Sequence, residues 1–183
     1  MSLILSETDQ AEFLSVYLGL MYYIWLSGDL NLEDETIEAF LEQPDIVREV
    51  CRDLIYYEEE VIDNYKAEHE DVLDESALEL LDSIYAGLLS EFIILKDTPE
   101  YAVLYQMEEK QFYQVVNITG PFREMLPHIP IKIKAGIVDF KGRIVCDGVI
   151  TNSNKMIATA FINKLNKEYE KAVSAGTVIE LLD

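Results

Sequence analysis

The sequence predicts an α+β protein: an N-terminal helical layer followed by an antiparallel β-meander with a C-terminal helix. Three observations predict this class. Apolar residues recur at helical spacing up to about residue 97, and runs of aromatic and β-branched residues separated by short turns follow. The net charge of −21 also lies entirely in the first part. We expect an acidic helical region over residues 1–97 and a sheet plus helix over 98–183, either separate or packed as one compact unit.

The first two predicted elements are helices of different character. Residues 7–27 carry apolar side chains all round the cylinder, which is typical of a central helix, and Gly28 ends the run. Residues 33–43 predict a shorter acidic helix, because Pro44 disfavours helical geometry in the residue before it.

Residues 45–66 and 76–95 predict two further helices, each with apolar side chains at steps of three and four along one face. Ser76 and Glu79 have the spacing of a capping box at the start of the second. The apolar faces are Val47, Val50, Leu54, Tyr57 and Val61 in the first helix, and Leu78, Leu81, Tyr85, Leu88, Phe92 and Leu95 in the second. We expect them to pack together as an antiparallel hairpin; a coiled coil between two chains is the alternative.

The second part predicts strands joined by short connections. Residues 101–107 and 111–118 read as a hairpin, and residues 120–126 as an irregular or single-turn segment. Residues 131–138 have a period of two, with apolar residues at 131, 133, 135 and 137 and outward-facing lysines at 132 and 134. The remaining predicted elements are a turn at Lys141-Gly142, a strand over 143–150 in which Gly148 marks a bulge or a close approach, a helix over 155–174 ended by Gly176, and an edge strand over 177–182.

The distribution of charge excludes some classes of partner. Residues 1–97 carry 4 basic and 25 acidic side chains, whereas residues 98–183 carry 10 of each. Such a field repels phosphate backbones and anionic membrane surfaces, so we expect neither nucleic acid nor a membrane as partner. A basic protein suits the charge, although acidic helical faces are most often simply solvated.

Two cysteines without metal-type spacing, Cys51 and Cys146, fit a reducing cytoplasm. The apolar run over residues 13–26 is shorter than the roughly 20 residues that span a bilayer.

Few residues are candidates for chemistry. His69 lies in an acidic stretch and reads as a surface residue, whereas His128 lies between two prolines, where a fixed backbone would orient its ring. Asp139, Arg143 and Asp147 are the charged residues of the most distinctive hairpin, and Arg143 and Asp147 are expected on one strand face. The sequence has no recognisable catalytic motif, phosphate-binding loop, metal-ligand spacing or cofactor site. We therefore predict no cofactor and no metal.

One hairpin and the helix after it carry a resemblance. The segment Phe140 to Gly148 reads Phe-x-Gly-Arg-Ile-x-x-Asp-Gly, and Leu165 to Tyr169 reads Leu-Asn-x-x-Tyr. With the apolar stretch 176–182, these motifs resemble the C-terminal module of uncharacterised bacterial proteins over roughly residues 101–182. That module has no assigned activity, so the resemblance implies a fold and a bacterial origin, and no catalytic residue.

These observations favour a non-enzymatic interaction or regulatory protein of the bacterial cytoplasm, acting through its acidic helical region or through self-association. The alternative is an enzyme or small-ligand binder with a site around His128, Asp139, Arg143 and Asp147. Mimicry of nucleic acid by the acidic helices is a third hypothesis.

Overall fold

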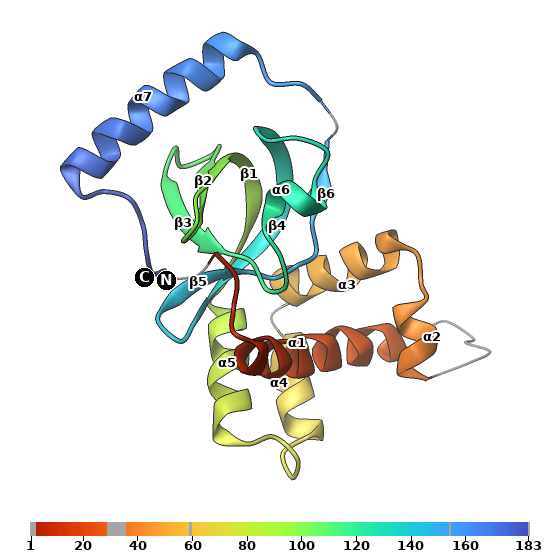
Figure 1. Ribbon diagram of the computed structural model, residues 1–183. Coiled ribbons are helices and arrows are strands. Elements are labelled where there is room, and N and C mark those ends of the chain that lie inside the picture. The colour runs from red at the N-terminus through yellow and green to blue at the C-terminus, as the bar shows by residue number, and fades with distance from the viewer. Residues whose placement is uncertain (1–2, 29–35, 59, 154, 183) are drawn as a thin grey trace. The chain divides into compact units, whose positions relative to one another are not determined.

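The computed structural model describes residues 3–28, 36–58, 60–153 and 155–182 (Figure 1). The chain forms two compact units. Residues 7–87 make the helical unit, and residues 1–6 join residues 88–183 in the barrel unit. The predicted α+β class is confirmed, with helices first, then a sheet, then a helix. The division expected near residue 97 falls at residues 87 and 88, because residues 88–97 form a strand of the barrel unit.

The helical unit is built around its first helix. It contains α1 (Glu7–Ser27), α2 (Ile37–Leu41), α3 (Asp45–Tyr57), α4 (Glu60–Glu68) and α5 (Glu75–Tyr85), and α1 contacts all four of the others. The buried side chains of α1 are Phe13, Val16, Tyr17, Leu20, Met21, Ile24 and Trp25. The central position predicted for residues 7–27 is confirmed. Part of the helix predicted over 33–43, residues 33–35, lies outside the described residues.

The single helix predicted over residues 45–66 is wrong, because the chain leaves helical geometry at Glu58. The backbone there is extended, with φ −109° and ψ 95°, and α4 begins at Glu60. This break puts Glu60 and Asp63 in the first turn of α4, where the amide dipoles of a helix favour carboxylates.

The helix predicted over 76–95 is wrong beyond Tyr85, because residues 88–97 are strand β1 (Leu88–Asp97). Residues 92–95 are buried on both faces of β1, so their apolar run fits a helical period as well as a strand. The β-branched pair Ile93 and Ile94 favours the strand. The helix also begins earlier than the predicted capping box, since the Asp74 side chain accepts the Ala77 N–H at 2.8 Å.

The barrel unit closes five strands into a ring. After β1 come β2 (Ala102–Gln106), β3 (Phe112–Val116), β4 (Ile131–Phe140), β5 (Arg143–Cys146) and β6 (Thr151–Asn152). The order is β1-β2-β3-β5-β4, and β1 also pairs with β4. Strand β6 pairs with Ile133 and Lys134 of β4, before the residues that pair with β5. The predicted hairpins β2–β3 and β4–β5 are confirmed as antiparallel.

The sheet is mixed, where the sequence predicted a wholly antiparallel meander. Strand β3 lies beside β5 and pairs with it in parallel, through Val115 with Ile144 and Val116 with Val145. Closure through β1 and β4 gives both strands a partner on each side, whereas an open meander would leave unpaired edges. The strand predicted over 143–150 is interrupted after Cys146 and resumes at Thr151, and Gly148 in the gap has φ +85°.

Side chains alternate between the barrel interior and its outer face. The interior holds Leu3, Phe92, Ile94, Ala102, Leu104, Tyr113, Val115, Ile131, Ile133, Ala135, Ile137, Ile144 and Cys146, together with Phe122 of α6 (Phe122–Met125) and Leu126. The outer face of β1 to β3 packs against α7 (Thr159–Ala175) through Leu165 and Tyr169. Helix α7 begins four residues later than predicted and ends at Gly176, which has φ +66° as a C-terminal stop requires.

Two chain segments complete the barrel at β3. Ile4 forms a parallel bridge with Asn117, and Ile179 forms one with Tyr113. The predicted addition of residues 177–182 to the sheet is therefore found as this short bridge. Ile179 and Leu182 also pack against the barrel interior.

Candidate functional site

The four residues singled out in the sequence lie on or beside β4 and β5 of the barrel unit. Asp139 lies on β4, and both of its carboxylate oxygens accept the Leu182 N–H, at 3.1 and 3.0 Å. Burial raises the pKa of Asp139, and the Leu182 N–H opposes that effect. Arg143, at the start of β5, donates to the Glu100 carbonyl oxygen at 3.4 Å. It borders a hollow of about 90 Å³ with Tyr101 and Glu180.

Asp147 and His128 lie elsewhere. Asp147 is buried, and its carboxylate accepts the N–H groups of Gly136 and Val149 at 3.1 and 3.0 Å. It has left the strand that carries Arg143, so the expected shared face is not formed. His128 is exposed and lies just before the start of β4, whereas Asp139 lies near the end of that strand.

Asp139 and Asp147 bind backbone amides, which is a structural role, and the hollow beside Arg143 is smaller than the 300–1,000 Å³ typical of small-molecule sites. The hypothesis of an enzyme or small-ligand binder with a site around these four residues stays a prediction.

Other chemically capable residues also have packing roles. Burial raises the pKa of the Cys51 thiol to about 11, so it is protonated at neutral pH and a poor nucleophile. His69, expected at the surface, is half-buried, and its ring lies 4.3 Å from that of Tyr65. Among the described residues, no three His, Cys, Asp or Glu side chains cluster as a metal site requires. No helix in the described ranges has the length and apolar character needed to cross a membrane.

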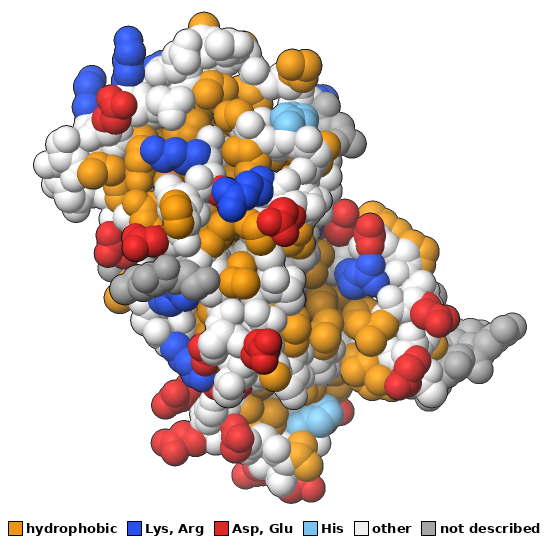
Figure 2. Space-filling view, in the orientation of Figure 1, with side chains coloured by type: hydrophobic (Ala, Val, Ile, Leu, Met, Phe, Trp, Pro, Cys, Tyr) orange, Lys and Arg blue, Asp and Glu red, His pale blue; other side chains and the backbone are white. Residues whose placement is uncertain are grey.

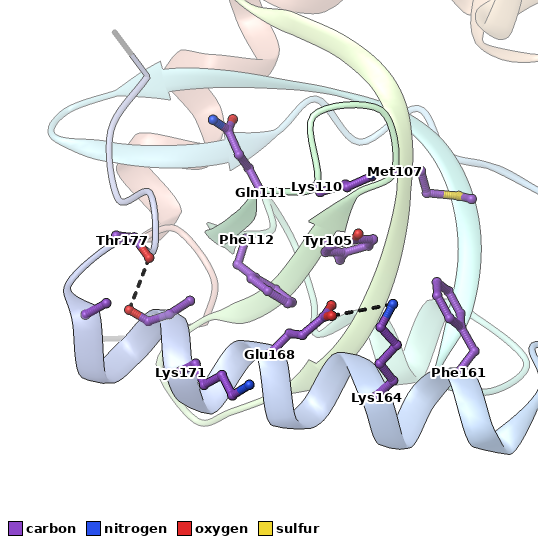
Figure 3. A pocket seen from close by; sticks show the side chains of 12 residues that line it. Tyr105, Met107, Lys110, Gln111, Phe112, Phe161, Lys164, Glu168, Lys171 and Thr177 are labelled. Atoms are coloured by element: carbon purple, nitrogen blue, oxygen red, sulfur yellow. Dashed lines mark hydrogen bonds and ion pairs between the residues drawn. The ribbon is translucent and has the colours of Figure 1, made fainter.

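A hollow of the barrel unit lies between α7 and the β2–β3 hairpin; we call it the α7 groove (Figure 3). Its volume is about 690 Å³. Tyr105 and Phe112 come from the strands, and Phe161 comes from the first turn of α7. The other lining residues are Met107, Lys110, Gln111, Lys164, Glu168, Lys171, Ala172, Ala175 and Thr177. The groove thus joins aromatic walls to charged groups at its rim.

The charge of the α7 groove is positive. Lys110, Lys164 and Lys171 line it with one carboxylate, that of Glu168, which lies 3.6 Å from the Lys164 ammonium. Figure 3 shows this pair on α7 and Lys110 across the groove on the hairpin. Next to the groove, burial raises the pKa of Tyr169 well above its usual range, and its hydroxyl lies 3.4 Å from that of Tyr101. Tyr169 is therefore neutral at neutral pH.

A second surface lies on the helical unit. Ile46, Val50 and Tyr57 of α3 are 60%, 52% and 63% exposed, and helical periodicity sets them in one line. We call these three residues the α3 stripe. The buried residues of α3 are instead Cys51, Arg52 and Ile55. The apolar face predicted for this helix is thus recovered in part, but the expectation that it packs inside a hairpin is wrong for Val50 and Tyr57.

Carboxylates lie beside the α3 stripe, and one of them, Asp45, forms an ion pair with Arg48. Asp45 and Glu58 are exposed and Glu49 is half-buried, all on or next to α3. The helical unit as a whole has 3 basic and 23 acidic residues, whereas the barrel unit has 11 basic and 12 acidic. Figure 2 shows the same contrast, with carboxylates over the helical unit and lysines along α7.

Together these features define a closed mixed β-barrel with a covering helix, joined to an acidic helical unit. A five-stranded Greek-key barrel is also the architecture of the OB-fold, but a fold of that kind hosts many functions and assigns none. Comparisons of the chain with models of known families, with curated proteins and with solved structures found no match. The resemblance of residues 101–182 to a bacterial module stays a prediction.

Proposed function

We propose that this chain is a non-enzymatic interaction protein whose acidic helical unit binds a positively charged partner through the α3 stripe. The observation that carries the proposal is the row of Ile46, Val50 and Tyr57, each more than half exposed, on a unit with a net charge of −20. Exposed apolar patches with polar rims are typical of protein-binding sites.

The α3 stripe and the carboxylates beside it contribute differently to binding. Removing apolar surface from water contributes about 25 cal/mol per Å², so the stripe supplies affinity. The carboxylates of Asp45, Glu49 and Glu58 attract a cationic partner and reject an anionic one. The partner that suits both is an amphipathic helix with an apolar stripe flanked by lysine or arginine.

The test uses a synthetic 18-residue amphipathic helix of leucine and lysine, titrated by fluorescence anisotropy. We expect the variant Ile46→Ser with Val50→Ser to bind this peptide at least tenfold more weakly than the wild type, because two aliphatic side chains no longer contribute their burial. Raising NaCl from 50 to 500 mM should also weaken binding to the wild type.

Two controls decide whether the binding is specific. Val72→Ser removes an apolar side chain that is 73% exposed outside α3, and its affinity should equal that of the wild type. A peptide of the same composition with leucine and lysine shuffled should bind weakly to every variant. Equal binding of the amphipathic peptide by the wild type and the α3 variant would show that charge alone attracts it, and the proposal would be rejected.

A further inference from the structure

The α7 groove and the α3 stripe have complementary properties. Resting on the proposed function, we propose that the partner is a second copy of this chain, whose α7 groove, lined by three lysines and one carboxylate, receives the α3 stripe. The groove is apolar with a net positive rim, and the stripe is apolar with an acidic rim. The charges beside the two apolar surfaces are therefore opposite in sign.

The two surfaces also match in length. The α3 stripe runs from Ile46 to Tyr57, which is about 17 Å along a helix at 1.5 Å per residue. The lining residues of α7 run from Phe161 to Ala175, about 21 Å by the same measure. The groove therefore has room for the whole stripe along its length.

Charge favours this pairing over two others. Two α3 stripes packed against each other would bring the carboxylates of two units of charge −20 together, which costs free energy through like-charge repulsion. A nucleic acid would meet the lysines of the groove but also the repulsion of a chain with net charge −21. The barrel unit, with 11 basic and 12 acidic residues, is the part of a second copy that an acidic helical unit approaches without repulsion.

A stripe-to-groove contact is heterologous, because two different surfaces meet. Each chain in such a contact keeps one unused groove or stripe, so the assembly grows from head to tail unless a ring closes. Its average mass should therefore rise with protein concentration. High salt should oppose this growth, because lysines and carboxylates face each other.

The experiment is sedimentation velocity of the full chain from 1 to 200 μM at 50 mM NaCl. We expect the wild type to show an average mass that rises well above the 21.0 kDa of one chain. Two variants should stay monomeric: Ile46→Ser with Val50→Ser, which removes the stripe, and Lys164→Glu with Lys171→Glu, which reverses the rim of the groove. Far-UV circular dichroism checks that both fold.

Mixing the two variants tests the heterologous contact directly. The groove variant still has a stripe and the stripe variant still has a groove, so an equimolar mixture should give a species of two chains and nothing larger. A matched control, Lys155→Glu with Lys167→Glu, makes the same change in net charge at exposed residues that do not line the groove. This control should associate as the wild type does.

Three results would overturn the inference. They are a wild type that stays monomeric at 200 μM, a mixture of variants that stays monomeric, and a groove variant that still self-associates. The last would point to contact between two α3 stripes. If the amphipathic peptide still binds the α3 stripe while the wild type is monomeric, the proposed function stands and only the second copy as partner is rejected.

Discussion

Two aspartates of the barrel unit show how differently a buried carboxylate is accommodated. Asp147 follows the end of β5, and its two carboxylate oxygens accept hydrogen bonds from the Gly136 N–H of β4 and the Val149 N–H. Asp97, at the end of β1, accepts the Arg123 N–H through Oδ2 at 3.0 Å. Its buried Oδ1 has no hydrogen-bond partner among the described groups. Burial accordingly raises the pKa of Asp97 above its ordinary 3.8.

The raised pKa of Asp97 predicts a pH dependence with a definite sign. The folded state binds this proton more tightly than the unfolded state, so the contribution of the group to stability is present below pH 3.8 and is lost as the pH rises through the folded pKa. We expect Asp97→Asn, which cannot ionise, to become more stable relative to the wild type as the pH rises from 3 to 7. Urea unfolding across that range measures the difference. A constant or decreasing difference would contradict the prediction.

At the scale of elements, the link between β5 and β6 depends on Gly148. Its φ of +85° is one that residues with a Cβ rarely adopt, and a Cβ there would lie 3.2 Å from Cδ1 of Ile118. The turn lets the chain resume pairing with β4 at Thr151. Glycine at this position is therefore a requirement of the barrel.

Replacing this glycine should weaken the barrel unit measurably. We expect Gly148→Ala to lower the free energy of unfolding by about 1–2 kcal/mol, from the left-handed backbone and the close contact together. Gly120→Ala is the matched control, because a Cβ at Gly120 meets nothing within 4 Å. Its change should stay within about 0.5 kcal/mol. Equal effects of the two substitutions in urea unfolding would refute this account of Gly148.

Helices and strands whose apolar residues repeat with one clear period were predictable from the sequence, and the other elements were not. The alternation over residues 131–138 and the turn at Gly142 identify β4 and β5 by local rules. Strand β1 was predicted wrongly as helix because residues 92–95 are all apolar. Such a run fits the helical period of 3.6 and the strand period of 2 equally well. The pairing of β1 with β4 joins residues about 40 apart in sequence, and no local pattern encodes it.

The candidate site was predicted only in part for a similar reason. The sequence identified Val50 and Tyr57 as apolar positions of one helical face, but exposure depends on which neighbours the fold supplies. The α7 groove was missed because its walls come from the β2–β3 hairpin and from α7, which are separated by about 50 residues. A signal did exist in Phe161, Lys164, Glu168 and Lys171, which share one face of a helix.

At the scale of the molecule, the two units differ most in charge. The helical unit holds a net charge of −20 in residues 7–87, and self-repulsion of that size opposes compaction. The barrel unit is nearly neutral and has no such penalty. Added salt should therefore raise the stability of the helical unit and leave the stability of the barrel unit almost unchanged.

Trp25 makes this prediction measurable, because it is the single tryptophan of the chain and is buried in α1. We expect the urea midpoint of its fluorescence to rise as NaCl increases from 20 to 300 mM, since screening weakens the repulsion between carboxylates. Hydrogen exchange of amides in β1 to β4 should change little over the same range. A midpoint that falls with salt, or a barrel that responds as strongly as Trp25, would contradict the charge argument.

The bridge between Ile4 and Asn117 has a consequence for synthesis on the ribosome. Residues 3–5 are translated before the helical unit, yet their partner in β-pairing, Asn117, is translated only after that unit and three strands. The helical unit can fold as soon as it leaves the exit tunnel, whereas the barrel waits for residues from both ends of its interrupted sequence. We therefore expect the helical unit of the nascent chain to fold while the strands of the barrel unit are still being translated.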